Sequence, residues 1–203
     1  MLEEYNITQT TLKILNQYDD NYKKSLHLRE IARKTKMDVK TIQLQLKKLE
    51  KINVLSSAIR GKNKEYVLNL DNVITKYYLI MGEIFSAIVY IQQNFLIKKI
   101  MTELESKVDG TLILFGSFAK GGYTKESDVD LFFISKKKIE KNIVHKITNL
   151  VGRDINIKSI DETKFLSGLR NKDPLVSEVV SNHIVLKGAD KFCDMLWRYY
   201  EAY

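Results

Sequence analysis

One segment, residues 112–131 with the sequence LILFGSFAKGGYTKESDVDL, constrains the fold of this chain more than any other. The apolar run at its start is typical of a buried strand, which ends at Gly116-Ser117 and runs into a short helix. Glycine lets the backbone come close to a ligand, and Ser117 offers a hydroxyl and a backbone N–H at a helix N-terminus, where phosphate oxygens are favoured. Ser127 is expected to bond to backbone groups of the polar loop and to fix the start of the next strand.

Two carboxylates open this second strand, in the run Asp128-Val129-Asp130. Side chains two residues apart in a strand point the same way, so Asp128 and Asp130 share one face while Val129 packs into the core. Two carboxylates beside a phosphate site are what Mg²⁺-dependent phosphoryl chemistry needs. Asp128 and Asp130 are therefore predicted to be ligands of Mg²⁺ or Mn²⁺ and to be catalytic.

These residues closely resemble the polymerase-beta-like nucleotidyltransferase superfamily in its minimal form. The resemblance covers about residues 97–187, and its signature is Gly-Ser, a loop of about this length and Asp-x-Asp between apolar strands. It implies transfer of a nucleoside monophosphate from a nucleoside triphosphate, expected to be ATP, to a hydroxyl acceptor in the presence of Mg²⁺. The nucleotide would be bound by Gly116, Ser117, Ser127 and Asn156.

One position departs from that family. Active members carry a third carboxylate on the next strand, and the matching residue here is Asn156, which has no charge and cannot act as a base. Asp154 lies two residues earlier on the same predicted face, about 6–7 Å away at the rise of a strand. Either Asp154 substitutes as a catalytic residue, or the site is weakened.

The net charge of +8 is spread unevenly along the 203 residues, because residues 1–70 carry +6 and residues 71–203 carry +2. A basic N-terminal part beside a nearly neutral C-terminal part favours a nucleic-acid module joined to something else. Solubility is the plainer explanation, and charge alone does not decide between them.

Hydrophobic periodicity predicts three helices followed by a hairpin in the basic part of the chain. The helices are expected at residues 8–18, 26–36 and 39–51, and the strands at residues 54–59 and 65–70, joined by a basic tip at residues 60–64. This arrangement, over about residues 5–70, resembles a winged helix-turn-helix domain, so we expect double-stranded DNA as a partner. The residues expected to contact DNA are Lys40, Thr41, Gln43 and Lys47 on the third helix and Arg60, Lys62 and Lys64 at the hairpin tip. The alternatives are a solvated helix face with a basic turn, and a protein-binding module.

Residues 71–108 are expected to be largely helical, with a break near Met81-Gly82. Within them, residues 84–96 are apolar almost all round, and such a helix must be buried. We expect a connector between domains that forms a homodimer interface, or else burial within the same chain.

The predicted fold class is α+β, with three parts. They are a winged helix-turn-helix domain at residues 1–70, a helical connector at residues 71–96, and a nucleotidyltransferase domain at residues 97–203 with a mixed sheet and flanking helices. In this last part, strands are expected at residues 111–115, 128–134, 154–160 and 183–186, and helices at residues 139–151, 161–169, after Pro174 and from residue 189 to the end.

Composition excludes several other classes of protein. The single cysteine, Cys193, rules out a disulfide-stapled scaffold, and no Cys/His cluster has the spacing of a zinc site. Met1 is followed by Leu-Glu-Glu, so we expect no signal peptide. The most apolar stretch falls short of about 18 residues, so we expect no membrane partner and a cytoplasmic location.

Two functions remain open at this stage. The first is an enzyme whose acceptor is a protein or nucleic acid hydroxyl, such as a partner toxin modified by an antitoxin. The second is a transcriptional regulator whose transferase domain is weakened, senses nucleotide or is inert.

Overall fold

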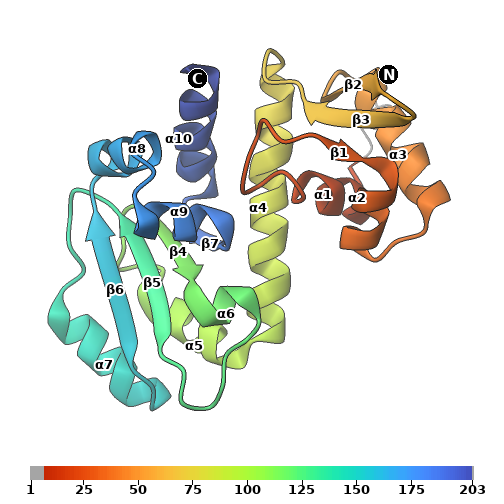
Figure 1. Cartoon of the computed structure of the whole chain (residues 1–203). Helices are drawn as coiled ribbons and strands as arrows, with labels where there is room; N and C mark the ends of the chain where they lie inside the picture. The colour runs from red at the N-terminus through yellow and green to blue at the C-terminus, as the bar shows by residue number, and fades with distance from the viewer. Residues whose placement is uncertain (1–6, 203) are drawn as a thin grey trace. The chain divides into compact units, whose positions relative to one another are not determined.

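The computed structural model describes residues 7–202 and gives a mixed α+β fold. It contains two compact units, which we call the N-terminal unit (residues up to 82, with residues 196–203) and the C-terminal unit (residues 83–195). The predictions that fall on residues 1–6 and 203, including the absence of a signal peptide, lie outside the described residues. Figure 1 labels the elements.

Three helices begin the N-terminal unit: α1 (Gln9–Leu15), α2 (Leu28–Thr35) and α3 (Val39–Lys51). Asp38 caps the start of α3, because its carboxylate accepts a hydrogen bond from the Thr41 backbone N–H at 2.8 Å. One apolar stripe of α3 is buried, and its members are Ile42, Leu46 and Leu49. The opposite face is therefore left to solvent.

A small antiparallel sheet follows, with the order β1-β3-β2 and the strands β1 (Leu26–His27), β2 (Leu55–Arg60) and β3 (Asn63–Leu68). The prediction of a helix from residue 26 is wrong by two residues, because Leu26 and His27 pair with β3 before α2 begins. The hairpin is also tighter than predicted, since Arg60 faces Asn63 and only Gly61 and Lys62 form the turn. Gly61 has a φ of +61°, which suits a glycine in a two-residue hairpin turn.

The long helix α4 (Val73–Gln93) has no break at Met81-Gly82, so that prediction is wrong. A Cβ atom at Gly82 would lie 2.3 Å from Oδ1 of Asn16, so a larger residue there would require the Asn16 side chain to move. The helix ends at Gln93, and Asn94 caps the next helix, α5 (Phe95–Leu104), by accepting a hydrogen bond from the Ile97 N–H.

By length and composition alone, α4 could cross a membrane. One such helix is weak evidence, because the core helix of a soluble protein passes the same test.

The C-terminal unit is built on a four-stranded sheet with the order β6-β5-β4-β7. Its strands are β4 (Thr111–Phe115), β5 (Val129–Ile134), β6 (Ile155–Ile160) and β7 (Ile184–Lys187). β4 pairs antiparallel with both β5 and β7, and β5 pairs parallel with β6, so the sheet is mixed as predicted. β6 is an edge strand.

Helices cover both faces of this sheet. They are α5 together with α6 (Gly116–Lys120), α7 (Lys141–Val151), α8 (Glu162–Arg170), α9 (Pro174–Ser181) and α10 (Ala189–Ala202). On one face, Leu131 and Phe133 join a core with side chains from α5 and α7. On the other face, Phe132 contacts Phe165 of α8, which contacts Phe192 of α10. Asp130 lies on this second face, two residues before Phe132 along β5.

The polar residue that interrupts the apolar stretch of α4 is buried in an ion pair. Glu83 is 4% exposed, and its Oε1 lies 3.2 Å from Nε2 of His183. The other ring nitrogen of His183 lies 2.8 Å from the Val180 carbonyl oxygen. His183 is therefore a satisfied buried histidine, as buried polar groups must be.

Candidate active site

Three side chains from two neighbouring strands meet at the start of β5. The Asn156 amide Nδ2 lies 3.3 Å from Oδ2 of Asp128 and 3.3 Å from Oδ1 of Asp130. The parallel register explains this meeting, because Asp130 on β5 is directly opposite Asn156 on β6. Asp128 is exposed and Asp130 is half-buried, so the group lies at the surface of the C-terminal unit.

Gly116 forms the wall of this site on the side of β4. Its φ is +70°, and a Cβ atom at this position would lie 2.6 Å from Oδ2 of Asp130. Only glycine avoids both the left-handed strain and this overlap. The next residue, Ser117, is half-buried at the start of α6. The predicted Gly-Ser turn thus lies against the second aspartate of the pair.

The loop between α6 and β5 is held by hydrogen bonds at its end. Ser127 Oγ accepts a hydrogen bond from the Thr124 N–H at 2.8 Å, as predicted for a serine that organises this loop. The Arg153 guanidinium donates from Nη1 to the carbonyl oxygens of Thr124 and Ser127, each at 2.9 Å. From the sequence, Arg153 was expected either to meet phosphates or to be exposed. Its contact with backbone carbonyls leaves no signal in the sequence.

An aromatic cluster supports the beginning of the same loop. The rings of Phe118 and Tyr123 stack at 4.1 Å with an angle of 5° between their planes. The Tyr90 hydroxyl donates to the Phe118 carbonyl at 2.9 Å, and burial raises the pKa of Tyr90 to about 12. Tyr90 therefore stays protonated and keeps donating at physiological pH. Asn94 donates to the Tyr123 hydroxyl at 3.3 Å.

The structure does not bring Asp154 to the carboxylate pair by any contact of the described residues. Asp154 immediately precedes β6, and it lines an open depression together with Ile157 and residues of α7. Ile157 points away from Asn156 because side chains alternate along a strand. Asp154 thus borders the depression next to α7, whereas the Asn156 amide reaches the carboxylate pair.

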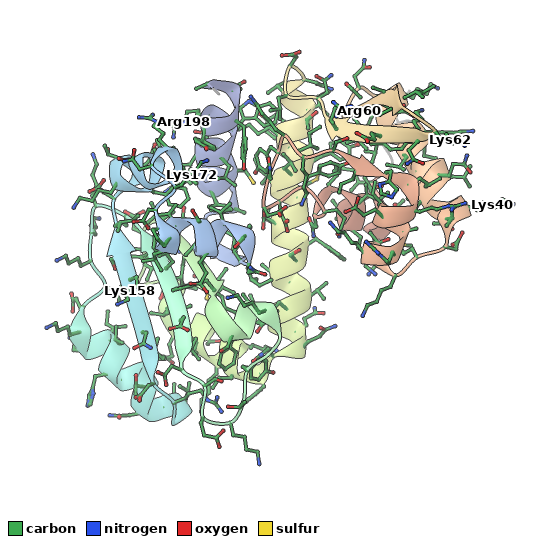
Figure 2. The ribbon with its side chains drawn as sticks, in the orientation of Figure 1. Lys40, Arg60, Lys62, Lys158, Lys172 and Arg198 are labelled. Carbon is green, nitrogen blue, oxygen red and sulfur yellow. The ribbon has the colours of Figure 1, made fainter. Side chains whose placement is uncertain are left out.

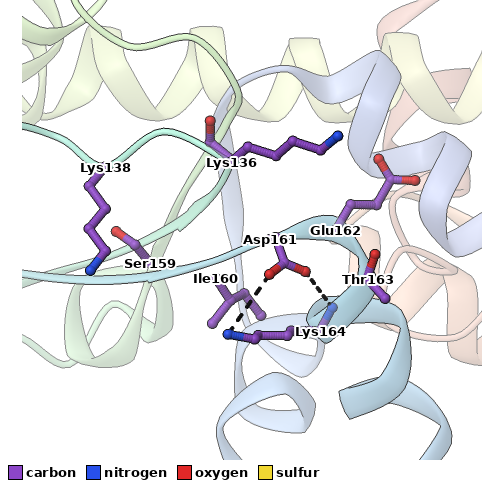
Figure 3. A pocket seen from close by; sticks show the side chains of 9 residues that line it. Lys136, Lys138, Ser159, Ile160, Asp161, Glu162, Thr163 and Lys164 are labelled. Carbon is purple, nitrogen blue, oxygen red and sulfur yellow. Dashed lines mark hydrogen bonds and ion pairs between the residues drawn. The ribbon is translucent and has the colours of Figure 1, made fainter.

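Another open depression, of about 550 Å³, lies at the far end of the same strands (Figure 3). Lys136 and Lys138 line it where β5 has ended, and Asp161 occupies the start of α8, where it accepts from the Lys164 N–H at 2.8 Å. Asp128 precedes the first residue of β5, so this depression is separate from the carboxylate pair.

The donor set fits a small divalent cation. Two carboxylate oxygens lie 3.3 Å from one point, the Asn156 nitrogen, and oxygen ligands of this kind are those that Mg²⁺ prefers. An amide turned by 180° would place its oxygen where its nitrogen now lies, as a third oxygen beside the two carboxylates.

The residues expected to contact DNA lie on the exposed face of α3 and on the hairpin (Figure 2). Lys40, Gln43 and Lys47 are exposed, and Thr41 is half-buried beside the Asp38 cap. Arg60 and Lys62 are exposed at the end of the hairpin.

Lys64 has a partner within the protein. Its Nζ lies 2.9 Å from Oε2 of Glu50 and 5.1 Å from the centre of the Tyr66 ring. Its hydrogen bond to Glu50 raises the pKa of Lys64. Sequence reasoning missed this pair because Glu50 and Lys64 are far apart along the chain.

Residues 97–180 match the family model described as "Nucleotidyltransferase domain". Two proteins of Methanocaldococcus jannaschii are similar to this chain. "Putative protein adenylyltransferase MJ1547" is 31% identical over 83 residues, which are 41% of this chain and 58% of that protein. "Putative protein adenylyltransferase MJ0141" is 41% identical over 56 residues, which are 28% of this chain and 56% of that protein. The chain thus spans a little over half the length of these curated relatives.

Two solved structures also resemble part of the chain. One is titled "Crystal structure of the toxin-antitoxin with AMP-PNP", with 16% identity, a TM-score of 0.37, and coverage of 52% of this chain and 86% of that one. The other is a "putative nucleotidyltransferase from Sulfolobus solfataricus", with 22% identity, a TM-score of 0.27, and coverage of 51% and 84%. The family match and the curated relatives bear out the nucleotidyltransferase part of the resemblance, and the family model matches residues 97–180.

Proposed function

We propose that the C-terminal unit binds ATP with Mg²⁺ and transfers AMP to a hydroxyl group of a protein. The observation that carries this proposal is the convergence of Asp128 and Asp130 beside Gly116. The choice of AMP and of a protein acceptor is supported by the names of the two relatives from Methanocaldococcus jannaschii.

In the proposed reaction, the acceptor oxygen forms a bond to the α-phosphorus of ATP, and the bond from that phosphorus to the bridging oxygen of pyrophosphate breaks. The acceptor hydroxyl loses its proton to a base or to solvent. Asp128 and Asp130 would hold Mg²⁺, which would supply positive charge to balance the charge on the phosphate oxygens. Gly116 and Ser117 accommodate the phosphates through their backbone, and Ser127 keeps the loop in place.

A second candidate is favoured by Asn156. Its amide donates to both carboxylates, where an active relative of this superfamily would offer a third carboxylate. Without that group nothing charged draws the proton from the acceptor, and a positioned general base contributes about 10²–10⁴-fold to rate. This chain would then bind ATP and transfer AMP slowly or not at all, acting as a regulator that senses nucleotide.

Transfer is tested by incubating the full chain with ATP labelled on the α-phosphate, Mg²⁺ or Mn²⁺, and lysate of the source cell. Label on a protein band supports AMP transfer, and the identity of the band gives the acceptor, which could include a toxin partner. ATP labelled on the γ-phosphate is the matched control, because AMP transfer leaves that label in pyrophosphate. Mg²⁺-dependent binding of ATP without transfer of either label would favour the regulator.

We also propose that residues 1–70 are a winged helix-turn-helix domain that binds double-stranded DNA. The proposal is supported by the order of α1, α2, α3 and the β2–β3 hairpin, and by the exposed basic side chains of α3 and of the hairpin. A helix with such a face fits the major groove, and the hairpin end fits the phosphates.

Replacing Arg60 and Lys62 by Ala should weaken binding to every duplex sequence, because both residues would meet phosphates. The slope of log affinity against log salt should become shallower by about 0.9 for each phosphate that the protein no longer neutralises. Gln43→Ala should instead change sequence preference, since Gln43 would reach base edges. A folded wild-type chain that shifts no duplex at low salt would contradict the proposal.

Two further assignments complete the proposal. Residues 71–96 connect the domain of residues 1–70 to the transferase domain of residues 97–203, and two chains form a homodimer through the apolar face of this connector. Exposed apolar side chains there support the dimer: Ile84 is 46% exposed, Ile88 is 49% exposed and Phe95 is 78% exposed. A cytoplasmic location agrees with the proposed use of ATP and DNA. Sedimentation of the wild type and of Phe95→Ser tests the dimer.

A further inference from the structure

We propose that Arg153 is a positioning residue that sets the place of the Asp128 carboxylate. The inference rests on the proposed nucleotide site and assigns a residue that the resemblance leaves without a role. Its basis is the pair of hydrogen bonds from Nη1 of Arg153 to the carbonyl oxygens of Thr124 and Ser127, each 2.9 Å long.

These bonds hold the backbone on one side of Asp128. The Ser127 carbonyl belongs to the peptide bond that joins Ser127 to Asp128. On the other side, the Val129 N–H donates to the Asp154 carbonyl at 2.9 Å. Both peptide bonds that flank Asp128 are therefore held by two consecutive residues, Arg153 and Asp154, which come just before β6.

The guanidinium group is itself fixed by stacking. Its central carbon lies 5.7 Å from the centre of the Phe118 ring, within reach of a cation–π interaction, and the same ring stacks on Tyr123 at 4.1 Å. Phe118 is 1% exposed, so the ring that the guanidinium group approaches belongs to the core of the C-terminal unit. Arginine suits this place better than lysine, because a planar group stacks on a ring and donates in fixed directions.

The other contacts that order the loop are the stacked Tyr123 ring and the hydrogen bond to the Ser127 hydroxyl. Residues 121–126 are all exposed, so burial of apolar surface contributes little to their position. Each ordered residue costs about 1–2 kcal/mol of backbone entropy. A carboxylate at the end of such a loop needs fixed neighbours if it is to meet a cation in one geometry, and misplacement by about 1 Å can cost 10²-fold in rate.

The test compares Arg153→Lys with Arg170→Lys in the full chain. Arg170 is an exposed arginine at the end of α8 in the same unit, so its replacement controls for the change of residue type. Two quantities are measured: hydrogen exchange of the amides in residues 121–128 and in the core of β5, and the affinity for Mn²⁺ with ATP, followed by Mn²⁺ spin resonance.

Arg153→Lys should speed exchange in the loop about tenfold, because the variant lacks the hydrogen bonds from this charged donor. Hydrogen exchange of the Leu131 and Phe133 amides should stay unchanged. If the substitution instead lowered the stability of the whole unit, exchange of these core amides would become faster as well. The affinity for Mn²⁺ with ATP should fall about tenfold, while Arg170→Lys should behave like the wild type.

If hydrogen exchange in the loop is unchanged in Arg153→Lys, Arg153 does not hold the loop. If exchange is faster but the affinity for Mn²⁺ with ATP is unchanged, Arg153 does not position the Asp128 carboxylate. A wild-type chain that binds neither Mn²⁺ nor ATP would instead overturn the proposed function, and the positioning role with it. The exchange measurement still reports in that case whether Arg153 holds the loop.

Discussion

β5 and β6 lie side by side in the sheet and both supply the candidate site, yet they differ in what surrounds them. Five of the six residues of β5 are buried, whereas β6 has one buried residue, Ile155. β5 has a strand on each side, and β6 is the edge of the sheet. The two aspartates of the family signature come from this region: Asp130 lies in β5, and Asp128 is the residue before it. Asn156, which stands where the family pattern has a third carboxylate, lies on the edge strand. A change of side chain there disturbs less packing than a change in β5.

The largest expected effect comes from breaking the packing of β5. Leu131 and Ile157 are opposite each other in the parallel register, but Leu131 is fully buried and Ile157 is half-buried. Leu131→Ala should lower the free energy of unfolding by about 2–5 kcal/mol. Ile157→Ala should lower it by about 1 kcal/mol, because this side chain buries less apolar surface.

Urea denaturation of the full chain, followed by a signal from the C-terminal unit, measures this difference. Equal losses of stability for the two variants would show that the edge strand is as tightly packed as its neighbour, and the comparison between β5 and β6 would fail.

The next effect concerns the carboxylates. Asp128→Ala should abolish Mg²⁺-dependent ATP binding, a fall of more than about 100-fold, since removing a metal ligand should exceed the 10–100-fold cost of removing its supporting partners. The matched control is Asp154→Ala, which removes a carboxylate that borders the depression next to α7 and contacts neither aspartate side chain in the described residues. Calorimetry giving equal affinity for wild type and Asp128→Ala would refute the assignment of the site.

Most of this site could be predicted because its signals are local. Gly116 and Asp130 belong to one motif, and their contact follows from a strand, a turn and the returning strand. The helix starts at Asp38 and Pro174 could also be predicted, because capping depends on residues that are close together in the sequence.

The predictions that failed depend on contacts between distant residues. β1 is two residues long, and only its pairing with β3 separates it from α2. Gly82 resembled a helix break, but its role is to admit the Asn16 side chain against a continuous helix. The contacts of Arg153 and the Lys64–Glu50 pair were not predicted for the same reason. No local sequence pattern indicates which carbonyl or carboxylate a long side chain will reach.

The third effect addresses Asn156. Asn156→Asp should raise AMP transfer by about 10²-fold, the lower end of what a positioned general base contributes, because a carboxylate would replace the amide between two metal ligands. Asp154→Ala should leave transfer unchanged. Both variants are assayed beside the wild type with ATP labelled on the α-phosphate.

The opposite pattern would favour Asp154 as the working acid. In that case the wild type transfers AMP, Asp154→Ala abolishes transfer, and Asn156→Asp changes the rate of transfer little. Such a result would mean that the edge strand shifts on binding substrate, through a local bulge that turns Asp154 toward the pair.

The smallest expected effect comes from Lys158, which shares the face of Asn156 on β6 and stands opposite Phe132 of β5 (Figure 2). Lys158 is exposed, so Lys158→Ala should change the free energy of unfolding by less than about 0.5 kcal/mol. Lys158 follows Asn156 by two residues, about 7 Å along the strand, and an exposed charge near a bound phosphate contributes about 1 kcal/mol at low salt. ATP affinity should therefore fall about fivefold at low salt and less at high salt, as titration calorimetry at two salt concentrations would show. A fall of more than tenfold that persists at high salt would mean that the edge strand holds the nucleotide directly, and β6 would then match β5 in importance for binding.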